Sequence, residues 1–328
     1  MKWKYLPGIV ISALFLFLAF RKVNLDDLKL ALERADYVYV IPAFLLSLVS
    51  LWIRAFRWRF LLRPLKTIGM ASLFNATAIG FMGNNLLPAR LGELMRAHVL
   101  GGKEKISRSA ALATIVVERV FDGFTLLFFL AIVFVAASPG FPGWLKKASA
   151  VAIVFYIVAL VFLVLFTLRT AAVMRVTEAI SRPLPEYVRR LLFRALNSFA
   201  NGLGVLRSTR DIVATALLSP LVWLPNAVII YLILVSFGIH LPVAVSFLLL
   251  VAVCIGIMIP SAPGYIGTIQ FVSAGVLTLF GVPRGEALSF SLVYHACIFI
   301  PITAAGLACL LAGKVSLDEM RLVIRQKE

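Results

Sequence analysis

Residues 109–137 read SAALATIVVERVFDGFTLLFFLAIVFVAA, an apolar run that contains three acidic or basic side chains well inside it. An α-helix rises 1.5 Å per residue and needs about 20 apolar residues to cross a bilayer, so this run predicts a transmembrane helix. Glu118, Arg119 and Asp122 lie at a depth where each charge costs at least about 2.5–3.5 kcal/mol on insertion scales. Such charges persist when they pair and face the protein interior or water. The run therefore predicts a helix that turns its charged face into a membrane protein.

Similar apolar runs are distributed along the whole chain. The 328 residues are 62% hydrophobic and 14% charged, with a mean hydropathy of +1.00, whereas soluble domains are about 45–50% apolar. This composition excludes a water-soluble fold and predicts an all-α polytopic membrane protein. The other runs lie near residues 5–20, 38–53, 71–87, 147–168, 211–237, 243–259, 264–281 and 286–312.

Two segments are expected to form re-entrant hairpins. Run 71–87 is followed by a polar stretch, residues 92–101, that would cover only about 15 Å as a helix and so cannot return across the membrane. A hairpin over 71–102 accounts for this, and a second over 243–281 opens to the other side by the parity of crossings. We predict about six full spans plus these two Pro/Gly-broken hairpins, arranged as an inverted repeat. The hinge residues are Pro88, Gly92, Pro260, Pro263, Gly264 and Gly267.

The basic residues indicate how the chain is oriented. The formal net charge of +17 comes from Lys and Arg between the apolar runs, the pattern of basic loops held on the cytoplasmic side, so it does not point to nucleic acid. We expect a plasma-membrane protein with both termini in the cytoplasm. The basic group that ends the second run is also expected there, and it comprises Arg54, Arg57, Arg59, Arg63 and Lys66.

The whole chain, 1–328, is expected to be one integral membrane domain. The first half, 1–168, holds the first hairpin, and the second half, 211–312, holds the second. A cytoplasmic linker, 169–210, joins them; its amphipathic pattern, with Arg on the polar face, favours an anionic leaflet. Residues 313–328 form a cytoplasmic tail.

A set of polar residues near the first hinge is the candidate substrate-binding site. Arg119 can reach Asp122 at i+3, and the six charges of the set sum to zero, which fits a structural network that holds the hairpin to the next span. Alternatively, one or more arginines bind a ligand phosphate, since the guanidinium fork suits bidentate phosphate contacts. The set comprises Asn85, Arg90, Glu93, Arg96, Glu118, Arg119 and Asp122.

Two further polar residues fall inside apolar runs. His295 is read first as a satisfied core histidine and second as a proton carrier. Together with Gln270 it is a candidate for a proton or polar relay.

The sequence lacks several motifs that mark nucleotide-binding proteins and hydrolases. It has no GxxxxGK[ST] phosphate loop, no HExxH and no GxSxG motif. Its three cysteines, Cys254, Cys297 and Cys309, lie in apolar runs without metal-ligand spacing. We therefore expect no cofactor, no metal site and no enzymatic activity.

Three blocks resemble the signature of a known family. NLLPARLGELMR at 85–96, ERVFD at 118–122 and PSAPGYIG at 260–267 are similar to the lysylphosphatidylglycerol synthase transmembrane-domain family, also described as flippase-like. The resemblance implies lipid translocation by a stand-alone member without the soluble synthase domain. Where the family pattern leads us to expect an acidic residue after the second hinge, this chain has Gln270, which argues against a carboxylate-coupled role there.

The leading hypothesis is translocation of an anionic lipid, or of a lipid-linked glycan precursor, through a polar groove inside the membrane. The partners are then membrane lipids, either phospholipids or polyprenyl-phosphate-linked glycans, and a separate lipid-synthesising enzyme, with no oligomeric state assigned. One alternative is an intramembrane enzyme that acts on lipid phosphates, which the same residues could serve. Another is a non-transporting partner subunit of a lipid-modifying enzyme.

Overall fold

The computed structural model of the chain describes residues 6–21, 23–87, 90–136, 169–181, 185–259 and 261–312, with isolated positions between 151 and 165. These residues form twelve α-helices, three short 3-10 helices and no strand, so the prediction of an all-α fold is confirmed. The α-helices are α1 Leu6–Phe20, α2 Leu25–Arg34, α3 Val40–Leu62, α4 Met70–Leu86, α5 Gly92–Glu104, α6 Arg108–Ala136, α8 Thr170–Ser181, α9 Glu186–Gly202, α10 Thr209–Ser236, α11 Val243–Gly256, α12 Thr268–Leu279 and α13 Arg284–Ala312. The 3-10 helices are η2 Tyr37–Tyr39, η4 Leu203–Arg207 and η5 Pro263–Tyr265.

Three of the described helical segments are long and apolar enough to cross a membrane: Tyr37–Leu62, Thr209–Ser236 and Arg284–Ala312. Each keeps large apolar side chains exposed, such as Leu45, Leu217 and Leu307, as expected where helices face lipid. With 29 residues, α6 is as long as α13, but it carries the three central charges. The chain is thus a multi-pass membrane protein. The predicted span over 147–168 falls largely outside the described residues.

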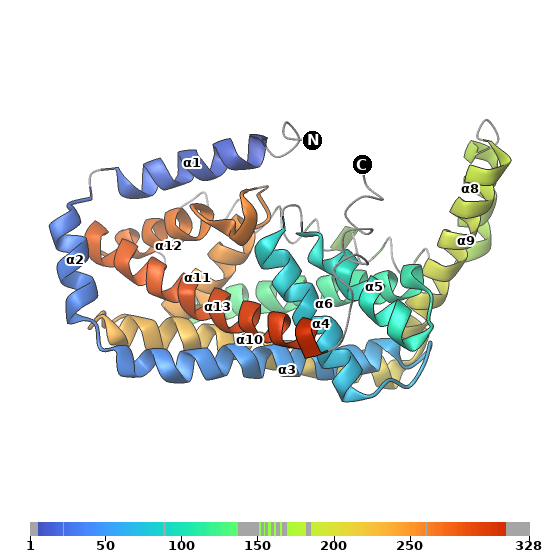
Figure 1. Ribbon diagram of the computed structural model, residues 1–328, viewed down its shortest axis with the longest axis horizontal. Coiled ribbons are helices and arrows are strands. Elements are labelled where there is room, and N and C mark those ends of the chain that lie inside the picture. The colour runs from blue at the N-terminus through green and yellow to red at the C-terminus, as the bar shows by residue number, and fades with distance from the viewer. Residues whose placement is uncertain are drawn as a thin grey trace.

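The two halves of the chain repeat one order of elements in opposite directions (Figure 1). Each half has a long helix, a hairpin and a second long helix: α3, α4–α5 and α6, then α10, α11–α12 and α13. α3 and α10 pack antiparallel, because the Asp36 amide donates to the Ser236 carbonyl (2.8 Å) at one end and Arg63 pairs with Asp211 (3.0 Å) at the other. Since each hairpin follows one of these helices, the hairpins start from opposite ends of the molecule. This is the inverted repeat that the sequence predicts.

Small residues let the two helices of the first hairpin come close together. A Cβ on Gly80 would lie 2.6 Å from the Arg96 Cβ, and one on Gly83 would lie 2.7 Å from the Met95 sulfur. A Cβ on Gly92 would meet the Gly80 carbonyl oxygen directly. Glycine is the residue that permits such backbone approach inside a membrane protein. The α4–α5 pair is therefore a compact unit rather than two independent spans.

The second hairpin turns through η5 and is covered by α1. Gly264 and Gly267 have φ of 74° and 87°, a left-handed backbone that only glycine adopts freely. Ser12 of α1 accepts a hydrogen bond from the Ala262 amide (2.7 Å), and the Phe15 and Phe271 rings stack with centroids 4.9 Å apart. The turn is thus fixed by contacts from α1. Of the predicted hinge residues, Pro88 and Pro260 lie outside the described residues.

The segment between the halves forms a projection at one end of the helical body. α8 and α9 extend from the end at which α3 finishes, while α2 lies at the opposite end (Figure 1). The base of the projection is anchored, because Gly202 lies directly against the Ala110 carbonyl of α6 and Leu203 is buried. The placement of 169–210 in the cytoplasm stays a prediction, and the tail 313–328 lies outside the described residues.

Replacing Gly92 by alanine places a Cβ against the Gly80 carbonyl, so α4 and α5 must separate. We expect the free energy of unfolding to fall by about 1–3 kcal/mol, measured by unfolding in detergent micelles. Gly102→Ala in the same helix is the control, since nothing lies within 4 Å of its added Cβ. The control should match or exceed the parent in stability because alanine is the better helix former. Equal stability of the two variants would contradict the close packing.

Candidate functional site

Glu118 is the centre of a buried ion cluster. Its carboxylate accepts hydrogen bonds from Arg96 (2.9 and 3.0 Å) and Arg119 (2.9 Å), and it lies 3.2 Å from Arg57 Nη2. The side chains of Glu118 and Arg57 are completely buried. One carboxylate thus joins three helices: α3, α5 and α6.

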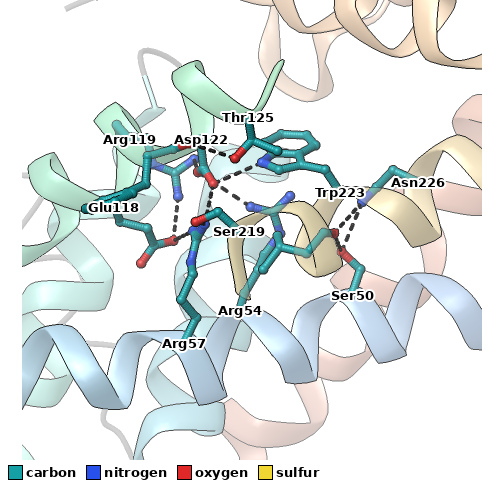
Figure 2. A network of polar contacts seen from close by, with 12 residues as sticks. Ser50, Arg54, Arg57, Glu118, Arg119, Asp122, Thr125, Ser219, Trp223 and Asn226 are labelled. Carbon is teal, nitrogen blue, oxygen red and sulfur yellow. Dashed lines mark hydrogen bonds and ion pairs between the residues drawn. The ribbon is translucent and has the colours of Figure 1, made fainter. Parts of the chain in front are cut away.

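Asp122 lies one helical turn further along α6 and gathers a second set of donors (Figure 2). Arg57 Nη1 donates to it at 2.8 Å, Trp223 Nε1 at 3.0 Å, and Arg119 Nη1 lies 3.2 Å away. Arg54 is more distant, at 3.7 Å. Because Arg57 contacts both carboxylates, the two sets form one cluster, to which α10 contributes Trp223.

Aromatic rings close the cluster on two sides. The Arg96 guanidinium lies 3.7 Å from the Trp58 ring centre, and Trp58 is fixed by a hydrogen bond to Thr114 (2.9 Å). The Arg54 guanidinium lies 4.3 Å from the Trp223 ring centre. Cation–π contacts of this kind offset part of the desolvation of a buried arginine. The rings also fix the rotamers of the charged side chains.

The cluster sits where the two apolar cores of the molecule meet. Along α3, Ala43 belongs to the core of the second half, and Ala55, Trp58, Leu61 and Leu62 belong to the core of the first hairpin. Along α6, Val117 and Phe129 are divided in the same way. Arg54, Arg57, Glu118 and Asp122 lie near these boundaries, so the charges occupy the junction between the two halves.

Arg90, Glu93 and Arg119 form the accessible edge of the cluster. The Arg119 and Glu93 side chains are 29% and 25% exposed and lie 3.6 Å apart. Arg90 is half-buried at the tip of the first hairpin and donates to the Ile257 carbonyl of the second (3.3 Å). It also interacts with the Tyr265 hydroxyl. The accessible charges therefore lie where the two hairpin tips meet.

Each hairpin tip holds a non-glycine residue with left-handed backbone. Arg90 has a φ of 54° and Tyr265 a φ of 57°. This conformation costs about 1–3 kcal/mol and concentrates at functional sites, where the surroundings impose it. The two strained residues face each other across the junction, so the fold aims both side chains at the same place.

α13 holds both hairpin tips. Asn85 of the first hairpin donates to Thr303 (2.9 Å) and to the Phe299 carbonyl (3.4 Å). Gln270 of the second accepts from the Gly267 amide (2.8 Å), and its own amide lies 2.9 Å from His295 Nδ1. Since the Gln270 oxygen is occupied by Gly267, its NH₂ group donates to His295. The Gln270–His295 pair thus fastens the second turn to α13, and its relay role stays a prediction.

The structure brings together most of the predicted site residues. Arg90, Glu93, Arg96, Glu118, Arg119 and Asp122 share one junction, and the predicted Arg119–Asp122 contact is present. Asn85 lies at the hairpin tip, where its hydrogen-bond partners are Thr303 and Phe299 of α13 rather than the ions. Whether these residues bind substrate stays a prediction.

The prediction that places Arg54 and Arg57 in a basic cytoplasmic segment is wrong. α3 continues to Leu62, and both arginines are buried inside it. Leu51, Arg54, Trp58, Leu61 and Leu62 recur at helical spacing, a signal visible when the pattern is followed past the first arginine. Because the zero-sum set omits these two residues, the cluster is not neutral: five arginines against three carboxylates leave a formal charge of +2.

The described residues hold no group of three or more His, Cys, Asp or Glu side chains that could bind a metal ion. The groups that define the cluster chemically are the guanidinium groups of its arginines, which converge on one junction. Such an arrangement recognises carboxylates or phosphates.

The chain is similar to the membrane region of one protein family over nearly its whole length. The profile of the family described as "Lysylphosphatidylglycerol synthase TM region" matches residues 5–306. A UPF0104 membrane protein of Methanothermobacter thermautotrophicus is 26% identical over 325 residues, 94% of this chain and 96% of that protein. A second UPF0104 membrane protein of that organism is 29% identical over 321 residues, 90% and 89% of the two chains. Glycosyltransferase AglD of Haloferax volcanii is 25% identical over 339 residues, 94% of this chain and 54% of that protein.

Neutralising Glu118 by Glu118→Gln leaves the buried Arg57 and Arg96 and the half-buried Arg119 short of a charge partner. We expect the free energy of unfolding to fall by about 3–5 kcal/mol, the cost of breaking a buried ion pair. Glu33→Gln is the matched control, because its pair with Lys29 is largely exposed and is worth about 0–1 kcal/mol. Similar stability of the two variants in micelles would show that the cluster does not support the fold.

Proposed function

The chain belongs to the family of the lysylphosphatidylglycerol synthase transmembrane region, and from this premise we propose that it moves an anionic lipid, or a lipid-linked glycan precursor, between the leaflets of the membrane. The observation that carries the proposal is the position of the ion cluster. Its accessible edge lies where two hairpins from opposite ends of the molecule meet. Paired interruptions of this kind mark the substrate site of inverted-repeat transporters.

The charge of the cluster supports an anionic headgroup. A formal +2 in a low-dielectric region is costly unless a counter-charge is present. Arg90 and Arg119 stand at the half-buried edge and offer planar donors for phosphate oxygens. Glu118 and Asp122, themselves paired with Arg57, hold Arg119 in position, and the Ile257 carbonyl holds Arg90.

The apolar surface of the helices suits the lipid tails. Side chains such as Val49 and Trp52 of α3 or Leu221 of α10 are exposed on the long helices. Acyl or polyprenyl chains remain among such side chains while the headgroup follows the polar junction. The lipid then crosses without exposing its tails to water or its phosphate to hydrocarbon.

The relatives support a lipid- or glycan-related role. The family is named for a synthase of a lipid, lysylphosphatidylglycerol. One relative is a glycosyltransferase, and the region that matches this chain makes up 54% of that protein. We propose that a separate lipid-synthesising enzyme supplies the substrate and that this chain is itself not an enzyme. We further propose that the protein lies in the plasma membrane, with both termini and the base of the first hairpin in the cytoplasm.

An exchange assay tests the function. Proteoliposomes that contain fluorescently labelled phosphatidylglycerol, phosphatidic acid and polyprenyl-phosphate probes are compared with empty vesicles, and faster leaflet exchange of an anionic probe is expected. Arg119→Gln should slow exchange at least about tenfold, since a hydrogen bond to a charged group contributes about 1.5–3 kcal/mol.

Arg59→Gln is the control for this experiment, because Arg59 is exposed on α3 away from the cluster. It should exchange lipid like the parent. Exchange equal to that of empty vesicles for all probes overturns the proposal. Conversion of a probe to a new product in detergent, without a bilayer, would instead favour an intramembrane enzyme.

A further inference from the structure

The three carboxylates of the cluster pair closely with three of its five arginines. Glu118 contacts Arg57 and Arg96 at 3.2 and 2.9 Å. Asp122 contacts Arg57 at 2.8 Å and Arg119 at 3.2 Å, and Glu93 lies 3.6 Å from Arg119. Arg57, Arg96 and Arg119 are therefore balanced by Glu93, Glu118 and Asp122. The surplus of two charges belongs to Arg54 and Arg90.

Arg54 is a buried cation that, among the described residues, makes an ion pair but no hydrogen bond with a carboxylate of the cluster. It is only 6% exposed, and its nearest carboxylate oxygen, on Asp122, is 3.7 Å away. Its Nη1 has no hydrogen-bond partner among the described residues. The guanidinium lies 4.3 and 5.1 Å from the ring centres of Trp223 and Phe81. A buried guanidinium that lacks a hydrogen-bond acceptor is stabilised when an anion binds beside it.

Arg90 is the second surplus cation. Its partners are the Ile257 carbonyl (3.3 Å) and the Tyr265 hydroxyl, which carry no charge. The Phe81 ring centre of the first hairpin lies 5.1 Å from the Arg54 guanidinium and 5.9 Å from that of Arg119 at the accessible edge. The second hairpin thus contacts Arg90, and the first hairpin lies beside Arg54.

We propose that the site selects a lipid phosphate that carries two negative charges, a phosphomonoester, over a phosphodiester that carries one. The inference rests on the proposed function of the junction and adds the class of headgroup. A dianion neutralises the surplus charge completely, whereas a diester leaves one buried cation uncompensated. Arg90 acts by contact. Arg54 acts mainly through its charge, because Coulomb attraction extends further where the dielectric constant is low.

Binding in detergent tests the selectivity apart from transport. The purified full chain is presented with dioleoyl phosphatidic acid and dioleoyl phosphatidylglycerol, which share acyl chains and differ in phosphate charge. The pH is about 9, well above the second pKa of about 6 of a phosphomonoester on a protein side chain, so that the lipid monoester is a dianion. Bound lipid is counted by native mass spectrometry. We expect phosphatidic acid to bind at least about tenfold more tightly, as one further charge-assisted contact implies.

The two surplus arginines supply the variants. Arg54→Gln and Arg90→Gln each remove one surplus charge and should abolish most of the preference. Arg54→Gln, which removes a charge that makes no contact with the phosphate, should leave phosphatidylglycerol bound, whereas Arg90→Gln removes a phosphate contact and should weaken the binding of both lipids. Arg54→Lys keeps the charge and should keep the preference, and Arg59→Gln on the same helix should change nothing. Thermal unfolding of each variant identifies any loss of fold, and Arg90→Gln, at the half-buried tip, provides the second test if Arg54→Gln does not fold.

The outcomes separate this inference from the proposed function. Equal binding of the two lipids, or a preference that persists in both glutamine variants, overturns the selectivity. Faster leaflet exchange of phosphatidylglycerol without any preference for the monoester would leave translocation standing and reject the dianion. Selective binding of phosphatidic acid without leaflet exchange of any probe would support the preference for a dianion and reject translocation.

Discussion

A charge beneath the headgroups of a membrane is costly unless another charge meets it, and in this protein Arg57 satisfies that constraint for two carboxylates together. It lies on α3 and contacts Glu118 and Asp122 of α6 at 3.2 and 2.8 Å. Arg96 then ties α5 to the same carboxylate, and Trp223 ties α10 to Asp122. Four helices from both halves of the chain are thereby fixed around one junction, and the two hairpins are arranged relative to it.

The same cluster provides both stability and a site, because its charges are unequally buried. Arg57 and Glu118 are sealed inside the protein, whereas Arg119 and Glu93 reach the accessible edge. The inner carboxylates hold Arg119 in place, and the second hairpin holds Arg90, so a ligand meets donors that are already positioned. Gly264, Gly267 and the strained Arg90 and Tyr265 shape the hairpin tips, and the tips bring the second half of the chain to this edge.

Periodicity and composition were sufficient to predict the helical class, the two hairpins and most of the cluster. Apolar runs define spans directly, and charges inside such runs must find partners, so Glu118 and Asp122 could be predicted to be buried. The sequence pattern places Arg54 and Arg57 wrongly, because a basic residue after an apolar run normally marks the membrane surface. Their burial depends on α6 and on α10, which are far away in sequence. For the same reason, the sequence does not predict the surplus of positive charge. It also does not predict that both hairpin tips are attached to α13, because both features depend on tertiary contacts.

The coupling between Arg57 and Asp122 tests this account most directly. The free energy of unfolding in mixed micelles is measured for the parent, Arg57→Met, Asp122→Leu and the double variant. If the two residues form one unit that joins the halves, the effects of the single substitutions are strongly non-additive, with a coupling energy of about 1.5 kcal/mol or more. Effects that add to within about 0.5 kcal/mol would mean that the residues do not interact, and the account of the junction would be contradicted.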